Sequence, residues 1–415
     1  MKRSFLAVPL GAMALLAVAP FAAHADDLVT KGQYLAKAAD CVACHTAPGG
    51  QPFAGGRAFE LPFGVLYSPN ITRDPKTGIG GYGDDDWVRV LREGVALGGR
   101  HLYPAMPYAS YAKMTREDAL AIKAYLMSLA PISATAPQNR MKFPYSQRWL
   151  MVGWNAVNNP GKELKPDPSK RADWNRGAYL VEALGHCGEC HTPRNFMQGL
   201  KDSKAFAGAD IQGWHAYNLT SDKNAGLGDW SEAQLAQYLS TGHADGHGPA
   251  SGPMAEAIEN SLRFLTPEDI HAMVVYLKAL PAQPDGPPAV PAKAAPPAPN
   301  VEGAHLFVQA CAGCHLPDGT GRQSPWAALA GAHSTGDVAG TNLVQILAHG
   351  SQMQTAEGQV FMHSFTGGYT DAELAAIANY TIGQFGGRQG QVTPAQIKAA
   401  RGADDHKETE PPPRS

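Results

Sequence analysis

The sequence predicts a mainly α-helical protein built from three tandem helical units with long loops. Three repeated features support this prediction. The motif Cys-X-X-Cys-His occurs three times in 415 residues. A similar helix-like segment precedes each motif, at residues 32–35, 177–180 and 303–306. A segment with apolar residues at helical spacing closes each unit, at residues 114–126, 265–277 and 369–380.

The three motifs contain all 6 cysteines of the chain. They are formed by Cys41, Cys44 and His45, by Cys187, Cys190 and His191, and by Cys311, Cys314 and His315. This spacing lets two sulfurs reach one edge of a porphyrin, with the adjacent histidine below the iron. The motifs therefore predict three covalently bound haem c groups, with the histidines as axial ligands. A redox dithiol and a zinc site are alternatives, but neither requires the histidine.

Residues 1–25 have the pattern of a secretory signal peptide. Met1, Lys2 and Arg3 precede an apolar stretch, and small residues at Ala23 and Ala25 come before Asp26. We expect export to the periplasm or to the periplasmic face of a bacterial inner membrane, where c-type haems are attached. A retained membrane anchor is the alternative. No later apolar stretch is long enough to cross a membrane.

Composition excludes several classes of function. The formal net charge of −3 provides no basic field for nucleic acid. No Ser/His/Asp set, phosphate-binding loop or dinucleotide fingerprint is present, so we predict no catalytic residues. The 45 glycines and 33 prolines indicate long loops between the helices.

The first unit is predicted to span residues 26–135. Its closing helix should begin after Thr115, a good N-cap residue followed by acidic residues. Between the motif and this helix lies Met106, which we predict as the distal iron ligand. Methionine in that position raises the reduction potential of a haem. A junction, residues 136–170, follows; its aromatic stretch could pack between units or face a partner or a membrane.

The second unit is predicted to span residues 171–281, with Met254 as distal ligand and Thr266 as the N-cap of its closing helix. It repeats an Asn-X-Thr sequence of the first unit, at residues 70–72 and 218–220. The repeated sequence indicates either a turn or a hydrogen-bonding loop beside the haem.

The third unit is predicted to span residues 301–387, behind a Pro/Ala-rich linker, residues 282–300, that would tether it without fusing it to the second unit. Met362 is the predicted distal ligand, and nearby Met353 is a competitor. Residues 388–415 are expected to form a disordered tail. Histidine ligation is the alternative to methionine in the three units, through His101, His243, His247, His349 or His363.

The chain resembles the triple-haem cytochrome c subunits of bacterial periplasmic dehydrogenases for alcohol, gluconate, sorbitol, fructose and aldehyde. The resemblance covers nearly the whole mature chain. It rests on residues 32–48, 69–72, 77–80, 105–108, 143–155 and 190–195. It implies three cytochrome c-type domains, each wrapping one covalent haem, with Met106, Met254 and Met362 as distal ligands. The sequence departs from the family at His363, where a proline is expected, and in a C-terminal tail without an apolar segment.

The resemblance also implies a function. The chain would be an electron carrier and not itself an enzyme. It would receive electrons from a catalytic quinoprotein, flavoprotein or molybdoprotein subunit and pass them to ubiquinone or a terminal oxidase, with peripheral association with the inner membrane. A stand-alone multihaem enzyme, such as a peroxidase or sulfur-compound oxidoreductase, and a free soluble electron shuttle are the competing hypotheses.

Overall fold

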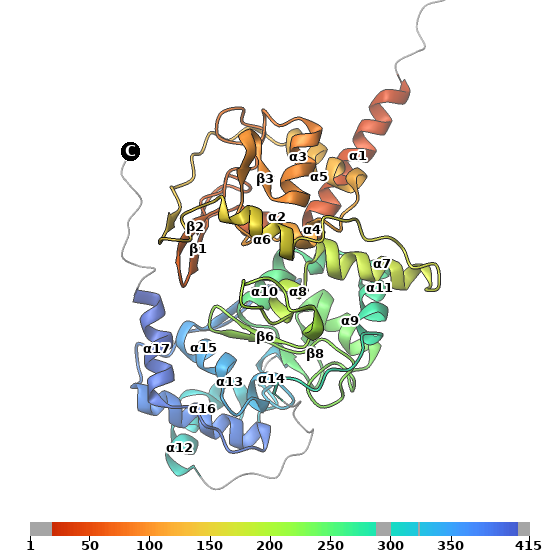
Figure 1. Ribbon diagram of the computed structural model, residues 1–415. Helices are drawn as coiled ribbons and strands as arrows, with labels where there is room; N and C mark the ends of the chain where they lie inside the picture. Colours follow the sequence, from red (N-terminus) through yellow and green to blue (C-terminus); the bar gives the residue numbers. More distant parts are fainter. Residues whose placement is uncertain (1–18, 288–299, 323, 406–415) are drawn as a thin grey trace, which may run out of the picture.

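The computed structural model describes residues 19–287, 300–322 and 324–405, and helices dominate it (Figure 1). The first unit contains α1 (Ala19–Ala38), α2 (Cys41–Cys44), α3 (Asp84–Glu93), α4 (Tyr108–Tyr111) and α5 (Arg116–Ser128). After α6 (Leu150–Asn158), the second unit contains α7 (Ala172–Tyr179), α8 (Gly188–His191), α9 (Glu232–Thr241), α10 (Gly252–Asn260) and α11 (Pro267–Lys278). The third unit contains α12 (Val301–Ala310), α13 (Ala312–His315), α14 (His333–Gly336), α15 (Thr341–His349), α16 (Asp371–Gly386) and α17 (Pro394–Asp405).

Short antiparallel strands occur in the loops that the sequence predicted. The first unit has a three-stranded sheet of β1 (Ala58–Leu61), β2 (Gly64–Tyr67) and β5 (Arg140–Met141), and a pair of β3 (Val95–Ala96) and β4 (Arg100–His101). The second unit pairs β6 (Ala209–Ile211) with β7 (Trp214–Ala216), and β8 (His243–Ala244) with β9 (Gly248–Pro249). The third pairs β10 (Ser351–Gln354) with β11 (Gln359–Met362). The strands are too short for sequence alternation to reveal them.

The first helix of each unit crosses the closing helix, and a glycine lies at each crossing. These pairs are α1 with α5, α7 with α11, and α12 with α16. A Cβ atom added to Gly32, Gly177 or Gly303 would lie 1.8, 1.9 or 2.3 Å from a backbone carbonyl oxygen of the closing helix. These distances are far below van der Waals contact, so only glycine lets the two backbones approach so closely.

The N-caps predicted at Thr115 and Thr266 are confirmed, and the third closing helix has the same cap at Thr370. Thr115, Thr266 and Thr370 each accept a hydrogen bond from the backbone N–H three residues later. The donor–acceptor distances are 3.2, 3.2 and 3.3 Å, respectively. Each closing helix therefore begins where the sequence predicts, because the capping side chain and the first acidic turn act locally.

The first and second units share one hydrophobic core and exchange matching polar contacts. The Tyr34 hydroxyl on α1 donates to Asp269 on α11 at 2.5 Å. In the reverse direction, the Tyr179 hydroxyl on α7 donates to Asp118 on α5 at 2.7 Å. Arg176 also binds both oxygens of Asp269, at 2.7 and 2.6 Å. The two units are thus joined by two equivalent tyrosine–aspartate hydrogen bonds, one in each direction.

Helix α6 of the junction uses one face for packing and leaves the other exposed. Trp154 is buried; its indole N–H donates to the carbonyl of Met197 at 2.9 Å, and its ring meets that of Tyr108 edge to face. On the outside, Trp149 is 68% exposed, and Phe143, just before the helix, is 81% exposed. The inner face of the junction therefore packs between units, and its outer face leaves large apolar side chains exposed.

The third unit packs directly against the second, so the prediction of a merely tethered unit is wrong. Its own core is separate, but Met353 of β10 is buried in the core shared by the first two units. Asn342 of the third unit and His215 of the second exchange two hydrogen bonds, of 2.7 and 2.9 Å. In Figure 1 the second unit (green) lies between the first (red to orange) and the third (blue). Most of the predicted linker, residues 288–299, lies outside the described residues.

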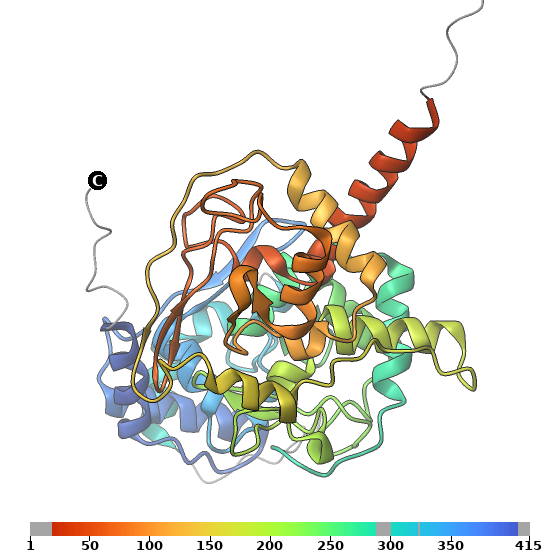
Figure 2. The same cartoon turned by 45° about the horizontal axis from the view of Figure 1, so that its top comes forward.

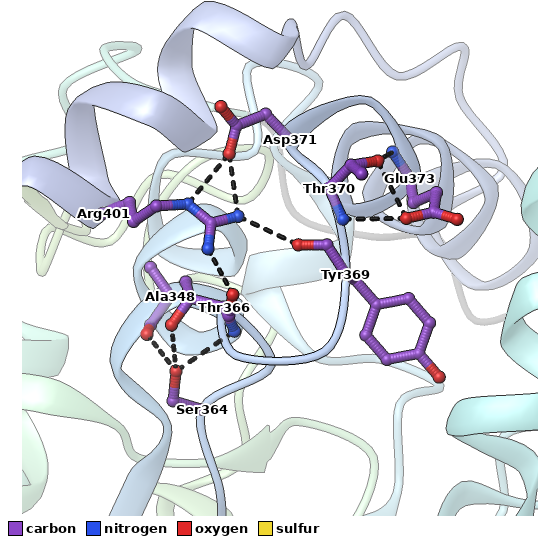
Figure 3. Close-up of polar contacts among 8 residues, drawn as sticks. All are labelled: Ala348, Ser364, Thr366, Tyr369, Thr370, Asp371, Glu373 and Arg401. Atoms are coloured by element: carbon purple, nitrogen blue, oxygen red, sulfur yellow. Dashed lines mark hydrogen bonds and ion pairs between the residues drawn. The ribbon is translucent and has the colours of Figure 1, made fainter.

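The predicted disordered tail is also wrong for residues 394–405, which form α17. Ile397 and Ala400 are buried against the third core because they lie at helical spacing on one face. Figure 3 shows the guanidinium of Arg401 bonded to Asp371 and to the carbonyls of Thr366 and Tyr369. This cation anchors α17 to the start of α16. Residues 406–415 lie outside the described residues.

Two further features concern the N-terminal part and the membrane. The start of α1 projects away from the rest of the structure in both views (Figure 2). The predicted signal peptide falls mainly on residues 1–18, which lie outside the described residues. Within the described ranges, no helix is both long and apolar enough to cross a membrane.

Replacing the glycine at a helix crossing should destabilise the protein. Gly177→Ala forces α7 and α11 apart, because the added Cβ meets the carbonyl of Ala272. We expect the free energy of unfolding to fall by about 1–3 kcal/mol, measured by denaturant unfolding. Gly153→Ala on α6 is the control, because its Cβ meets no atom within 4 Å. Equal stability of the two variants would contradict the role of the crossing.

Candidate haem-binding sites

Each motif histidine is oriented by a hydrogen bond from its Nδ1 to a backbone carbonyl. The distances are 2.8 Å for His45, 2.6 Å for His191 and 2.7 Å for His315, and the acceptors are the carbonyls of Pro69, Tyr217 and Ala327. A carbonyl oxygen has no proton to donate, so each ring carries its proton on Nδ1 and its lone pair on Nε2. This is the usual arrangement of a histidine that binds a metal through Nε2. Sequence reasoning missed the acceptors because they are backbone atoms.

Burial keeps these histidines neutral. It lowers the pKa of His45 and His315 below the ordinary value, and lowers the pKa of His191 to about 4. The carbonyl hydrogen bonds oppose this effect in each case, but burial is the larger influence. A neutral imidazole is the form that coordinates iron.

The two Asn-X-Thr sequences form turns that hold the first two carbonyl acceptors in place. The side-chain oxygen of Asn70 accepts from the N–H of Thr72 at 2.8 Å, and that of Asn218 accepts from the N–H of Thr220 at 2.7 Å. Both asparagine amides also donate to carbonyls in the chain that follows the closing helix. Because each asparagine directly follows an acceptor residue, these turns position the histidines as well as the chain.

The first two motifs open onto cavities that also contain the predicted methionines. The first cavity has a volume of about 800 Å³ and is lined by Cys41, Cys44, His45 and Met106. Its size lies in the range of cofactor pockets. The second cavity is smaller, with a volume of about 220 Å³, and is lined in the same way by Cys187, Cys190, His191 and Met254. The fold therefore brings together the residues that the sequence nominated in each of these units.

The cysteines do not have the character of activated thiols. Burial raises the pKa of Cys41, Cys44 and Cys187 to about 12, and that of Cys311 to about 11. Burial also raises the pKa of Cys190. A redox dithiol and a zinc site both need a stabilised thiolate. Within the described part of the chain, moreover, no three His, Cys, Asp or Glu side chains are grouped to hold a metal ion.

Asp40 forms a common wall between the first two cavities. It adopts a left-handed backbone conformation, with φ of 51°, between α1 and the first motif. Burial raises its pKa to about 8, and the neighbouring Glu256 adds to the effect, while Arg57 opposes it. Arg57 of the first unit in turn binds Glu256 of the second, with one N–O distance of 2.9 Å. The first two sites are therefore immediate neighbours.

The third motif lies against the core of its own unit. Cys311 is buried in that core, whereas Cys314 is exposed. Met362 on β11 packs against the same core, but Met353 belongs to the core shared by the first two units. The packing therefore favours Met362 over its competitor.

The histidine alternatives of the first two units gain little support from the geometry. Neither His101 nor His243 is among the described residues that line the first two cavities. His247 does line the second cavity, but its ring lies flat on Trp230, with 3.5 Å between the ring centroids. The sites as built fit a covalently attached haem: paired neutral thiols, an oriented imidazole and a thioether meet at each of the first two cavities.

Comparison with known proteins agrees with this chemistry. The family model for cytochrome c matches residues 29–130 and 301–381. The chain is 40% identical over 426 residues to the gluconate 2-dehydrogenase cytochrome c subunit of Pantoea cypripedii, covering 97% of this chain and 95% of the relative. It is 38% identical over 410 residues to the fructose dehydrogenase cytochrome subunit of Gluconobacter japonicus, covering 92% and 84%. It is 35% identical over 421 residues to the cytochrome c subunit of the quinone alcohol dehydrogenase of Gluconacetobacter polyoxogenes, covering 97% and 90%.

Two leucine variants separate the candidate iron ligands of the haem predicted at the third motif. Met362→Leu should convert one haem to a high-spin form and lower its reduction potential, because leucine has no atom that binds iron. Met353→Leu should leave the haem spectrum of the chain unchanged, since Met353 packs in the other core. Visible spectra and redox titration of the purified chain provide the measurement. The opposite pattern would assign the ligand to Met353.

Proposed function

This chain belongs to the family of cytochrome c subunits of dehydrogenases, and we propose that it carries electrons away from the catalytic subunit of such a complex through three covalently bound c-type haems. It is the electron carrier and not the subunit that oxidises the substrate. The observation that carries the proposal is the threefold combination of a Cys-X-X-Cys pair with a histidine whose Nδ1 is bound to a backbone carbonyl.

We propose that three cytochrome c-type domains, residues 26–135, 171–281 and 301–387, each hold one haem. The attachment sites would be Cys41, Cys44, Cys187, Cys190, Cys311 and Cys314. The axial ligands would be His45, His191 and His315 on one side and Met106, Met254 and Met362 on the other. When bound, the haem supplies a one-electron change at its iron. The histidines present Nε2 in a fixed orientation, and the methionine thioethers favour the reduced iron.

The arrangement of the three units supports transfer in series. The first two cavities share the wall at Asp40, and the second cavity is also lined by His333 of the third unit. The first two sites are thus adjacent, and the third unit reaches the wall of the second. A stand-alone multihaem enzyme would need an iron position open to substrate, whereas Met106 and Met254 line the first two cavities.

The names of the relatives indicate the class of the partner subunit. The relatives are named for dehydrogenases of gluconate, fructose and alcohol, so closely similar carriers serve different substrates. We propose that this chain receives electrons from a quinoprotein, flavoprotein or molybdoprotein subunit and delivers them to ubiquinone or a terminal oxidase. The predicted signal peptide and the covalent haems support a location in the periplasm or on the periplasmic face of the inner membrane.

We propose that the exposed face of the junction makes peripheral contact with the membrane. Phe143, Trp149, Val152 and Val157 are large apolar side chains that are more than half exposed. Residues 137–162 around them include four basic residues and no Asp or Glu. Aromatic rings combined with basic side chains suit the interface of an anionic bilayer.

The number of haems and the partner can be tested together. Intact mass of the exported chain should show three haem additions, and Cys311→Ala/Cys314→Ala should show two. Purification from the native host should recover a large cofactor-bearing subunit with the chain. A chain that carries no haem, or that is stable and solitary in its host, would contradict the proposal.

The membrane contact is tested with Phe143→Ser/Trp149→Ser. Loss of two exposed aromatic side chains should weaken binding to vesicles of anionic phospholipid by roughly tenfold or more, measured by co-sedimentation. Val301→Ser/Val308→Ser on α12 is the control, because these side chains are also exposed but lie outside the junction. If vesicle binding is unchanged and recovery of the catalytic subunit is lost instead, the face is a protein contact.

A further inference from the structure

A group of polar side chains lies at the contact between the second and third units, apart from the predicted attachment sites and axial ligands. It consists of His215, Tyr217 and His247 from the second unit with His333 and Asn342 from the third. We call these five residues the junction group; they lie apart in sequence from the junction of residues 136–170. All five line the second cavity. The rings of Tyr217 and His333 meet with 4.6 Å between their centroids. The group is therefore assembled by the docking of the third unit.

Two polar atoms of the junction group are buried without a hydrogen-bond partner. They are Nε2 of His215 and the hydroxyl of Tyr217; this hydroxyl lies close to the side chain of Asn342. A buried polar atom left unpaired costs about 1–3 kcal/mol, so such atoms usually have a ligand or water partner. Because both residues line the second cavity, a molecule that fills the cavity can provide the missing partner.

The ring of His215 is set up for an acidic ligand. Its Nδ1 bonds to a carboxylate oxygen of Asp210 at 2.6 Å. The other ring nitrogen, Nε2, is the buried atom without a partner, so a second acidic group can reach it from the cavity. The Tyr217 hydroxyl is a further donor on the same wall.

The walls of the first two cavities differ in their cationic side chains. The first is lined by Lys76, Arg100 and Arg148. Among the described residues that line the second, there is no lysine or arginine, and Asp40 is its acidic residue. A haem carries two carboxylate side groups that need hydrogen-bond donors or positive charge. In the second cavity, uncharged donors such as histidine, tyrosine and asparagine side chains can meet this need.

We propose that the junction group is a carboxylate-binding site for the acidic side groups of the second haem. His333 and Asn342 belong to the third unit, so the third unit completes the second haem site. The inference rests on the proposed function, because it requires a haem in the second cavity. It also accounts for the contact of the third unit at this point, where His215 and Asn342 exchange two hydrogen bonds.

The experiment uses Tyr217→Phe and His333→Phe in the full-length exported chain. Each variant keeps an aromatic ring but removes its hydrogen-bonding atoms. Intact mass should still show three haems. Redox titration should show a lower potential for one haem alone, because the carboxylate charge near its iron is less compensated and favours the oxidised state. The affected haem is identified as the one missing from Cys187→Ala/Cys190→Ala.

Two controls make the result specific. His305→Phe changes an exposed histidine of the third unit and should leave the three potentials unchanged. His333→Gln keeps an amide donor and should restore the potential lost in His333→Phe. If His333→Phe fails to fold, Tyr217→Phe decides the question, since it removes one oxygen atom.

The outcomes separate the inference from the proposed function. Three bound haems with unchanged potentials in Tyr217→Phe and His333→Phe would overturn the carboxylate site alone. An equal fall in the His305→Phe control would overturn it as well. A chain without haem in its second cavity would overturn the proposed function together with the inference.

Discussion

The close crossing of two helices at a glycine is the constraint on which each unit depends. At Gly32, Gly177 and Gly303 the first helix approaches the backbone of the closing helix more closely than any side chain would allow. The first helix ends just before the Cys-X-X-Cys-His motif, and the closing helix is fixed at its start by a threonine cap. The crossing therefore sets where the cysteines and histidine lie relative to the loops that complete the site. The crossing is thus the structural basis of the proposed haem site in each unit.

Inside this frame the chemistry is governed by burial and by backbone carbonyls. Burial keeps the cysteine sulfurs protonated and the histidines neutral, which suits covalent attachment and iron ligation and not thiolate chemistry. The carbonyls of Pro69, Tyr217 and Ala327 fix each imidazole with its lone pair on Nε2. In the first two units, the Asn-X-Thr turns directly follow the acceptor residues Pro69 and Tyr217 and fix the positions of their carbonyls. A site for a large cofactor thus depends on a small number of backbone positions.

The contacts between the units place the first two sites side by side and bring the third unit to the second cavity. Tyr34 with Asp269, and Tyr179 with Asp118, join the first two units by the same contact used twice. This places Asp40 between their cavities. The third unit is not related to the others in this way; it docks beside the second cavity and contributes part of its wall. The first two cavities share Asp40, and the second has a wall built from two units, which supports the proposed electron transfer along the chain.

The sequence by itself determined the repeated motifs, the closing helices and their threonine caps, because each depends on residues close together in the chain. It also nominated Met106 and Met254, which the fold places in the cavities beside their motifs. Only the tertiary structure decided the carbonyl partners of the histidines, the shared wall at Asp40, the docking of the third unit and the packing of α17 through Ile397 and Arg401. These features join residues far apart in sequence, and backbone acceptors and interface contacts leave no local pattern that could reveal them.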